Sequence, residues 1–177
     1  MSTKLTGRIV MPGDRDYNEA RLDYNKWFSM YSGAIVFCQN EHDVMNALKW
    51  ARQHKVPFRV RSGRHSYEAY SVLNGGIVID VSEMNRIHVN LKKRIAVIET
   101  GANLGTVYKE LSTKGVVIPA GSEPGVGIAG LTLGGGIGFL SRKWGLTCDN
   151  LLSIQMVQAV GRTGAQSIYA SKKKNPD

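Results

Sequence analysis

Two side chains of this sequence, His65 and Cys148, are nucleophiles in polar or glycine-rich surroundings. Neutral imidazole and thiolate are the good nucleophiles near neutral pH, and either can form a covalent bond to an electron-poor ligand. His65 lies in the polar segment Arg61–Tyr67, whose small residues offer amides and hydroxyls to an anion while its arginines add positive charge. Spacing alone leaves open the alternative of a solvated or structural histidine.

Cys148 directly follows a glycine-rich stretch, where a thiol could meet a bound ligand. The thiolate is the reactive form, and a positive neighbourhood lowers its free pKa of about 8.5. A single cysteine is more often a small buried hydrophobe, which is our interpretation of Cys38. The two cysteines stand far apart, so no disulfide is expected. The other histidines, His42, His54 and His88, are not spaced with His65 as metal ligands, and we expect no metal.

The glycine-rich stretch runs from Gly121 to Gly145, where nine of 25 residues are glycine. Glycine costs about 0.5–1 kcal/mol relative to alanine inside helices and strands, so this stretch indicates a backbone lying against something. Gly125, Gly127 and Gly130 match the dinucleotide fingerprint by letter, but Pro124 precedes them and a poor helix former follows. We therefore reject a Rossmann NAD site. The functional hypothesis is that the backbone amides of this stretch bind phosphate oxygens. The alternative is that the glycines only form tight turns without a ligand.

The elements that must position these residues form an α+β pattern. A buried strand over 34–37, a helix that begins after the N-cap Asn40 and ends before Pro57, and a strand over 58–61 make one lobe. The His65 loop follows that last strand directly. Further elements are expected as follows: helices at 18–28 and 104–111, a hairpin of 87–89 with 95–99, and strands at 77–81, 116–118 and 151–160. A lobe boundary is expected near 82–86.

Composition limits the class of protein. The chain has 177 residues, 42% of them hydrophobic, which suits one domain or two small lobes. The net charge of +9 suits an anionic cofactor, whereas nucleic acid is not expected because basic runs are short and aromatics are not interleaved with them. The first ten residues contain no apolar run typical of a signal peptide, and nothing reaches transmembrane length. We expect a cytoplasmic protein without a membrane partner.

Three segments together resemble the FAD-binding module of the berberine-bridge-enzyme-like family, of the vanillyl-alcohol-oxidase (PCMH) type. They are R-S-G-R-H-S-Y-E at Arg61–Glu68, the glycine-rich Pro119–Gly138, and G-L-T-C-D-N-L-L at Gly145–Leu152. The resemblance runs from about Tyr17 to the C-terminus. It implies a two-lobed α+β fold with FAD between the lobes, residues 1–82 forming the first lobe and 83–177 the second. In that family the histidine bonds the flavin 8α-methyl carbon and the cysteine bonds C6, which implies bicovalent FAD held by His65 and Cys148.

The resemblance also implies cofactor contacts from the first loop and the glycine-rich stretch. These residues are Arg61, Ser62, Gly63, Arg64, Ser66, Ser71, Gly121, Pro124, Gly125, Val126, Gly127, Gly130, Thr132, Gly134, Gly135 and Gly138. Arg64 stands where the family often has glycine, so its side chain must turn away or add a phosphate contact. Residues 157–161 lack the acidic residue that is usual there.

The resemblance implies an oxidoreductase that takes a hydride from an alcohol, sugar or related carbinol onto FAD, with oxygen as the electron acceptor. Two alternatives stay open: a dehydrogenase that passes electrons to a protein or quinone, and a flavin-holding or coat-type structural protein without turnover. Family members continue beyond Asp177 into a substrate domain that carries the base, so we name no catalytic residue. We expect this chain alone to be inactive, with incomplete flavin incorporation. The sequence does not give the oligomeric state.

Overall fold

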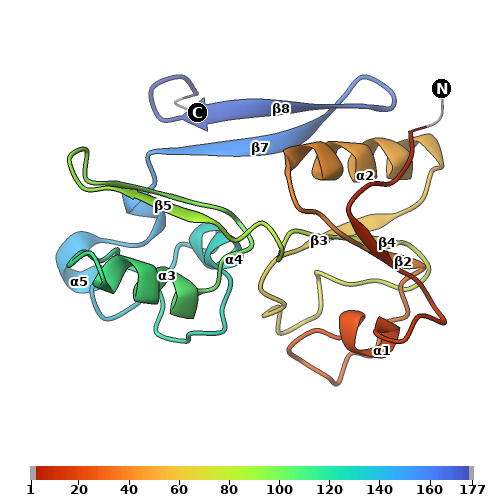
Figure 1. Cartoon of the computed structure of the whole chain (residues 1–177), viewed down its shortest axis with the longest axis horizontal. Coiled ribbons are helices and arrows are strands. Elements are labelled where there is room, and N and C mark those ends of the chain that lie inside the picture. Colours follow the sequence, from red (N-terminus) through yellow and green to blue (C-terminus); the bar gives the residue numbers. More distant parts are fainter. Residues whose placement is uncertain (1–2, 176–177) are drawn as a thin grey trace. The chain divides into compact units, whose positions relative to one another are not determined.

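The computed structural model describes residues 3–175, which divide into two compact units. The first unit comprises the described residues up to Arg61, the segment Ser66–Val81 and the residues from Leu152 onward. The second comprises Ser62–His65 and Ser82–Leu151. The chain thus passes between the units several times, and most of the elements are labelled in Figure 1.

The first unit contains a four-stranded sheet in the order β1-β2-β4-β3. Its strands are β1 (Arg8–Val10), β2 (Ala34–Phe37), β4 (Ile77–Asp80) and β3 (Phe58–Arg61). β4 pairs in parallel with both β2 and β3, while β1 is antiparallel to β2. Every residue of β2 and β4 is buried, as expected for apolar runs at the centre of a parallel sheet. The predicted strands at 34–37 and 58–61 are therefore confirmed.

Helix α2 (Glu41–Gln53) connects β2 to β3. The side chain of Asn40 accepts a hydrogen bond from the Asp43 amide, so the predicted N-cap is confirmed. Its buried stripe includes Ala47, Leu48 and Ala51.

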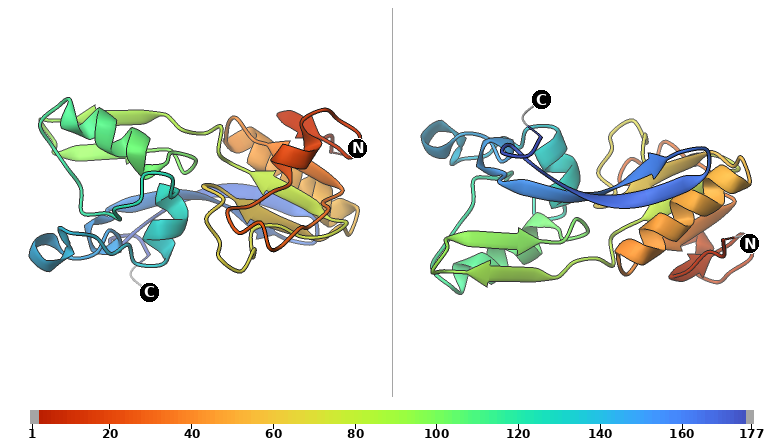
Figure 2. Two further views of the ribbon diagram at one scale, coloured as in Figure 1. Left: turned by 90° about the horizontal axis from the view of Figure 1, so that it is seen from below. Right: turned by 90° about the horizontal axis from the view of Figure 1, so that it is seen from above.

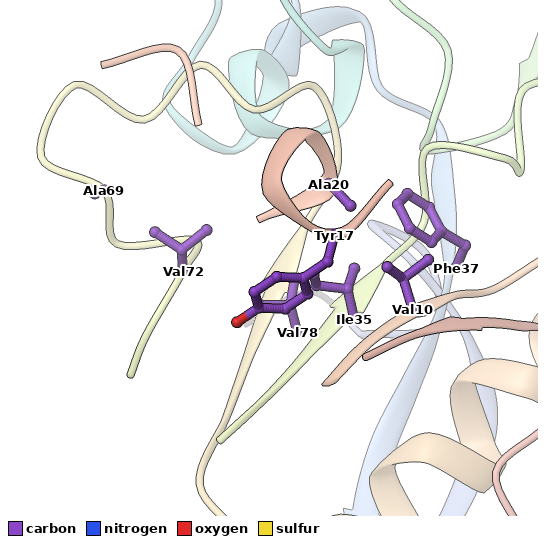
Figure 3. Packing of buried hydrophobic residues seen from close by; sticks show 8 residues of the cluster. All are labelled: Val10, Tyr17, Ala20, Ile35, Phe37, Ala69, Val72 and Val78. Atoms are coloured by element: carbon purple, nitrogen blue, oxygen red, sulfur yellow. The ribbon is translucent and has the colours of Figure 1, made fainter. Parts of the chain in front are cut away.

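A hydrophobic cluster packs against the sheet of the first unit around Tyr17. Figure 3 shows the Tyr17 ring beside Ile35 and Val78, and its hydroxyl donates to the Ser32 carbonyl at 2.6 Å. Tyr17 belongs to the single turn α1 (Tyr17–Ala20), so the helix expected at 18–28 is wrong beyond Ala20. The Asp23 and Asn25 side chains accept hydrogen bonds from nearby backbone amides, and such local bonds compete with a helix.

The first unit also contains a long hairpin of β7 (Ser153–Val160) and β8 (Gly164–Ser171). It packs on α2, as Figure 2 also shows, and the Arg52 guanidinium donates to the carbonyls of Val160, Gly161 and Gly164. The expected division into 1–82 and 83–177 therefore changes at two places. The hairpin groups with the first unit because it packs on α2, and Ser62–His65 groups with the second.

The second unit is built on the hairpin of β5 (Ile87–Asn90) and β6 (Ile95–Ile98), which packs on α3 (Leu104–Ser112). Leu104, Val107 and Leu111 are fully buried, which confirms the predicted helical stripe. The strand expected at 116–118 is wrong. Gly115 has a φ of +67° and the Val116 amide donates back to the Leu111 carbonyl, so Gly115 and Val116 complete the turn that ends α3, and 116–118 form no strand.

Three short helices follow in the second unit: α4 (Ile128–Leu133), α5 (Ser141–Trp144) and the 3-10 helix η1 (Cys148–Asn150). Across residues 3–175, no helix is long and apolar enough to cross a bilayer.

Candidate functional site

Two loops of the second unit meet backbone to backbone at Gly63 and Gly127. A Cβ built on Gly63 would lie 2.3 Å from the Gly127 nitrogen, and a Cβ on Gly127 would lie 2.7 Å from the Gly63 nitrogen. Cβ atoms essentially never approach this closely, so both positions require glycine. The Ser62 hydroxyl donates to the Thr100 carbonyl at 2.6 Å and ties the first loop to the end of the β5–β6 hairpin. The Gly63–Gly127 contact and the Ser62 hydrogen bond together fix the segment that carries His65.

The imidazole of His65 lies against Gly125. A Cβ on Gly125 would be 3.0 Å from His65 Nε2, so the ring occupies the space that a side chain would take. Gly125 is held in turn by its amide, which donates to the Glu123 carboxylate at 3.1 Å. His65 is half-buried. The structure therefore brings the predicted nucleophile and the predicted glycine-rich stretch together.

A pocket of about 260 Å³ lies in the second unit beside this contact. Its nine lining residues are Ser62, Gly63, Arg64, Ser82, Asn85, Gly101, Asn103, Thr106 and Gly125. They are hydroxyls, amides and glycines, with Arg64 the one charged side chain among the described lining residues. Such a lining suits a phosphate group, because hydroxyl, amide and guanidinium groups all donate to its oxygens.

The N-terminus of α3 adds a positive dipole end to this pocket, since Asn103 caps the helix and Thr106 lies in its first turn. The Asn103 side chain accepts from the Thr106 amide at 2.9 Å. The amides of Leu104 and Gly105 donate to the carbonyls of Val126 and Pro124, both at 2.9 Å. These amides hold the glycine-rich loop in place, so donors for a ligand must come from the other lining residues.

Helix α4 begins directly after Gly127, which corrects the expectation that a helix would form poorly there. The residues before Gly125 form a turn, in which the Val126 amide donates to the Glu123 carbonyl. The strand that a Rossmann site needs is therefore missing from this part of the described chain, although the helix is present.

Cys148 begins η1 and is held by the turn at Gly135 and Gly136. Its amide donates to the Gly135 carbonyl at 3.0 Å, and the Thr147 amide donates to the Gly136 carbonyl at 3.0 Å. The buried Thr147 hydroxyl donates to the Pro119 carbonyl at 2.9 Å. A Cβ on Gly136 would lie 2.2 Å from the Thr147 hydroxyl oxygen, so the tight turn fixes the half-buried cysteine. Cys148 and His65 belong to the same unit.

At several predicted site positions, packing or hydrogen bonds within the chain already explain the residue type. A Cβ on Gly138 would lie 1.8 Å from the Ala120 carbonyl oxygen, and one on Gly121 would lie 2.6 Å from Leu131. The Thr132 hydroxyl donates to the Ile128 carbonyl inside α4, and Val126 packs against the core of the second unit. Gly130 and Gly134 have more space: an added Cβ meets nothing within 4 Å at Gly130 and nothing closer than 3.6 Å at Gly134.

Three predicted site residues belong to the first unit, and one of them needs correction. The Arg61 side chain is 0% exposed and donates to Asp80 at 2.6 Å and to the Ala20 carbonyl at 2.8 Å, so its guanidinium is used inside the first unit and not as the expected cofactor contact. The hydroxyl of Ser71 donates to Asp23, and that of Ser66 accepts from the Tyr70 amide.

The sequence analysis missed the pocket residues Ser82, Asn85, Gly101, Asn103 and Thr106. Asn103 could have been found, because an asparagine directly before an apolar helical stripe is an N-cap signal. The others carry no local signal. Among residues 3–175, no group of three or more metal-ligating side chains is present.

The sequence matches the FAD binding domain family over residues 32–164. It is 55% identical, over 175 residues, to the uncharacterised FAD-linked oxidoreductase YgaK of Bacillus subtilis, covering 99% of this chain and 39% of that protein. The chain thus spans about two fifths of the length of the curated relatives it matches.

Two solved structures of other proteins share the fold of this chain. The 6-hydroxy-D-nicotine oxidase of Arthrobacter nicotinovorans matches with a TM-score of 0.91 and 32% identity, over 99% of this chain and 38% of that one. The berberine-bridge-enzyme-like protein 1 of Physcomitrella patens matches with a TM-score of 0.89 and 39% identity, over 97% and 37%. The expected α+β fold of the PCMH type is confirmed by these matches. The chain belongs to the FAD binding domain family, within the FAD-linked oxidoreductases of the berberine-bridge-enzyme-like type.

Proposed function

We propose that this chain is the flavin-holding part of an oxidase that takes a hydride from an alcohol, sugar or related carbinol and uses oxygen as its electron acceptor. We further propose that His65 and Cys148 hold FAD by two covalent bonds. The observation that carries the proposal is the His65 imidazole against Gly125, at the edge of a polar pocket whose charged side chain is Arg64. FAD, when bound, accepts the hydride from the substrate.

The residues of the second unit fit the cofactor. The Gly63–Gly127 contact leaves a cradle without side chains, and the pocket beside it offers donors to phosphate oxygens. His65 offers a ring nitrogen, and Cys148 a thiol on a segment fixed by Gly135. Both are half-buried, so each is held by the chain and still reachable by a ligand. We assign no base and no substrate-binding residue.

The oxidase part of the proposal is supported by the name of the hydroxynicotine oxidase, whose fold this chain shares. An assay of oxygen uptake and peroxide formation on the complete gene product, with alcohols and sugars as substrates, tests it. Reduction of an artificial acceptor without oxygen uptake would indicate the dehydrogenase alternative. The absence of both oxygen uptake and acceptor reduction would indicate the flavin-holding alternative.

Attachment is tested by three variants of the chain: His65→Ala, Cys148→Ala and the double variant. After acid precipitation, each single variant should keep flavin absorbance with the polypeptide, and the double variant should lose it. Matched controls are Cys38→Ala, which removes a buried cysteine of the first unit, and His88→Ala, which removes an exposed histidine of the second. Acid-stable flavin in the double variant would show that other residues attach it.

A further inference from the structure

We infer that Asn25 of the first unit is a positioning residue for His65, because it holds the chain directly after that nucleophile. The Asn25 side chain donates from Nδ2 to the Tyr67 carbonyl at 2.6 Å. Tyr67 follows His65 by two positions, and the chain passes from the second unit to the first between His65 and Ser66. The role of His65 as the attachment residue rests on the proposed function, whereas the hydrogen bond to Tyr67 does not.

The chain before His65 is held separately, by residues of the second unit. Gly63 and Gly127 meet backbone to backbone, and the Ser62 hydroxyl donates to the Thr100 carbonyl. These contacts fix the chain on one side of His65. Ordering a backbone costs conformational entropy, so a second tie after His65, made before the ligand binds, lowers the entropy that attachment has to lose.

The segment after the nucleophile is tied at both of its ends to the stretch that follows α1. Tyr67 is bonded to Asn25, and its ring packs edge to face against Tyr24, with the ring centroids 5.9 Å apart. Four residues further on, the Ser71 hydroxyl donates to the buried Asp23, whose carboxylate also accepts from the Tyr24 amide. The loop between Tyr67 and Ser71 is thus fixed at both ends within the first unit.

The same loop contains a strained residue, Ala69, whose φ is +55°. Its side chain is buried in the hydrophobic cluster around Tyr17. The Ala69 amide donates to the Ser66 carbonyl, and the Ala69 carbonyl accepts from the Val72 amide. A residue with a Cβ stays in the left-handed region only where the surrounding structure determines its conformation, and such strain is concentrated in functional segments. The contacts of this loop therefore impose its conformation at a cost, which favours a role beyond closing the chain.

The Asn25 amide group makes two contacts that a substitution can separate. Its Oδ1 accepts from the Trp27 amide at 3.1 Å, and its Nδ2 holds Tyr67. Asn25→Asp keeps an oxygen for the Trp27 amide and loses the donor to Tyr67, because an ionised carboxylate only accepts. Asn18→Asp is the matched control in the same unit. Asn18 is exposed on α1, and its Oδ1 accepts from Arg21 Nε at 3.2 Å, as a carboxylate oxygen also does.

The rate of attachment at His65 reports on the position of its imidazole. A ring nitrogen bonds the 8α carbon in place of one hydrogen of the methyl group. Two protons, one from the imidazole and one from the methyl group, leave together with two electrons. Oxygen, the acceptor of the proposed function, takes them up as hydrogen peroxide. This bond forms only when the ring nitrogen meets the carbon, so a less ordered loop should slow it.

The experiment compares two parents of the complete gene product: Cys148→Ala, which attaches flavin through His65, and His65→Ala, which attaches it through Cys148. Both are prepared free of flavin from riboflavin-limited cells, FAD is added under air, and the flavin that stays with acid-precipitated protein is followed over time. Asn25→Asp should slow attachment roughly 2- to 10-fold in the Cys148→Ala parent, as expected for loss of one ordering hydrogen bond, and leave the His65→Ala parent unchanged. Asn18→Asp should leave the rate unchanged in both.

A merely structural role of Asn25 would change both parents alike, so equal slowing in the two would overturn the inference. An unchanged rate in the Cys148→Ala parent, or an equal loss with Asn18→Asp, would overturn it as well. Absence of acid-stable flavin from both parents would contradict the proposed attachment and, with it, the role of Asn25 toward His65.

Hydrogen exchange of the flavin-free protein tests the tie itself, without the proposed function. The amides of Ala69, Tyr70 and Val72 are hydrogen-bonded within the loop, so Asn25→Asp should raise their exchange in a peptide that covers 66–72, and Asn18→Asp should not. Exchange that is unchanged in Asn25→Asp would overturn the inference whether or not flavin attaches.

Discussion

The buried ion pair of Arg61 and Asp80 should be one of the strongest single contributions to the stability of the first unit. Both side chains are 0% exposed, and Arg61 Nε lies 2.6 Å from Asp80 Oδ2. The same guanidinium donates to the carbonyls of Ala20 at 2.8 Å and Leu22 at 3.3 Å. It thereby ties the ends of β3 and β4 to the last residue of α1 and to the segment that follows it.

The perturbation we choose is Asp80→Asn, which keeps the volume of the side chain and removes its charge. A buried guanidinium then loses its counter-charge, and breaking a buried pair in this way typically costs about 3–5 kcal/mol. Small domains have a total unfolding free energy of about 5–15 kcal/mol, so the variant should lose a large fraction of it. Urea unfolding followed by circular dichroism measures the change, with the midpoint expected to fall sharply.

The control is the exposed pair of Arg8 and Asp16 in the same unit. Its N–O distance is 3.1 Å, but its side chains are 44% and 55% exposed, so Asp16→Asn should change the unfolding free energy by less than about 1 kcal/mol. Equal effects of Asp80→Asn and Asp16→Asn would refute the argument from burial.

A second variant separates the ion pair from the carbonyl contacts. Replacing both partners with apolar residues, as in Arg61→Met with Asp80→Leu, removes two buried charges together, which is often neutral or stabilising. Here it also leaves the buried carbonyl of Ala20 without this donor, at about 1–3 kcal/mol, and the partly buried carbonyl of Leu22 without it, at a smaller cost. The double variant should therefore stay less stable than the wild type. Full recovery would show that the carbonyl contacts contribute nothing.

Two further predictions concern the second unit. Gly125→Ala should push the His65 imidazole aside, because the new Cβ would lie 3.0 Å from Nε2, and should reduce acid-stable flavin. The control His88→Ala, which removes an exposed histidine of β5, should keep it, and equal flavin in the two variants would contradict the role of Gly125. Burial would raise the pKa of Glu99, but the hydrogen bonds and charge of Arg86 outweigh it and hold that pKa below its usual value. A carboxyl group whose pKa is lower in the folded chain than in the unfolded chain stabilises the fold at pH values above its unfolded-state pKa. This stabilisation is lost as the pH falls through the folded-state pKa. Below about pH 4.5 the wild type should therefore lose more stability than Glu99→Gln. Parallel acid-unfolding curves for these two proteins would contradict it.

The parts of the fold that the sequence predicts are those with a strong local signal. β2 is a short apolar run that becomes fully buried, and α2 begins at an asparagine whose side chain caps it. β8 was missed because Gly164–Ser171 is weakly apolar and owes its place to β7 and α2. The contacts of Arg52 with the hairpin join residues more than 100 positions apart, and no local pattern contains them.

The two arginines of the first motif show the limit of residue type as a guide to the site. Both are basic, both stand beside glycine or serine, and both were expected among the cofactor contacts. Arg61 is the last residue of β3, where the register Arg61↔Asp80 pairs it with an acid on the adjacent strand, so its charge is used inside the first unit. Arg64 comes after the strand has ended, in a left-handed turn that lines a pocket. The register of the sheet, set by residues far along the chain, therefore decides that the Arg61 charge is paired inside the first unit.

The glycines of the second unit show the same dependence on distant residues. Gly138 and Gly63 look alike in a glycine-rich sequence, yet the space for a Cβ is taken at Gly138 by the Ala120 carbonyl and at Gly63 by the backbone of Gly127. The first contact only closes the chain on itself, whereas the second holds the His65 loop against the stretch that carries Gly125. Glycine at Gly138 is thus required for folding, and glycine at Gly63 is required for folding and for the position of the nucleophile. Substitution by alanine should unfold the second unit locally at Gly138, while at Gly63 it should also separate His65 from Gly125.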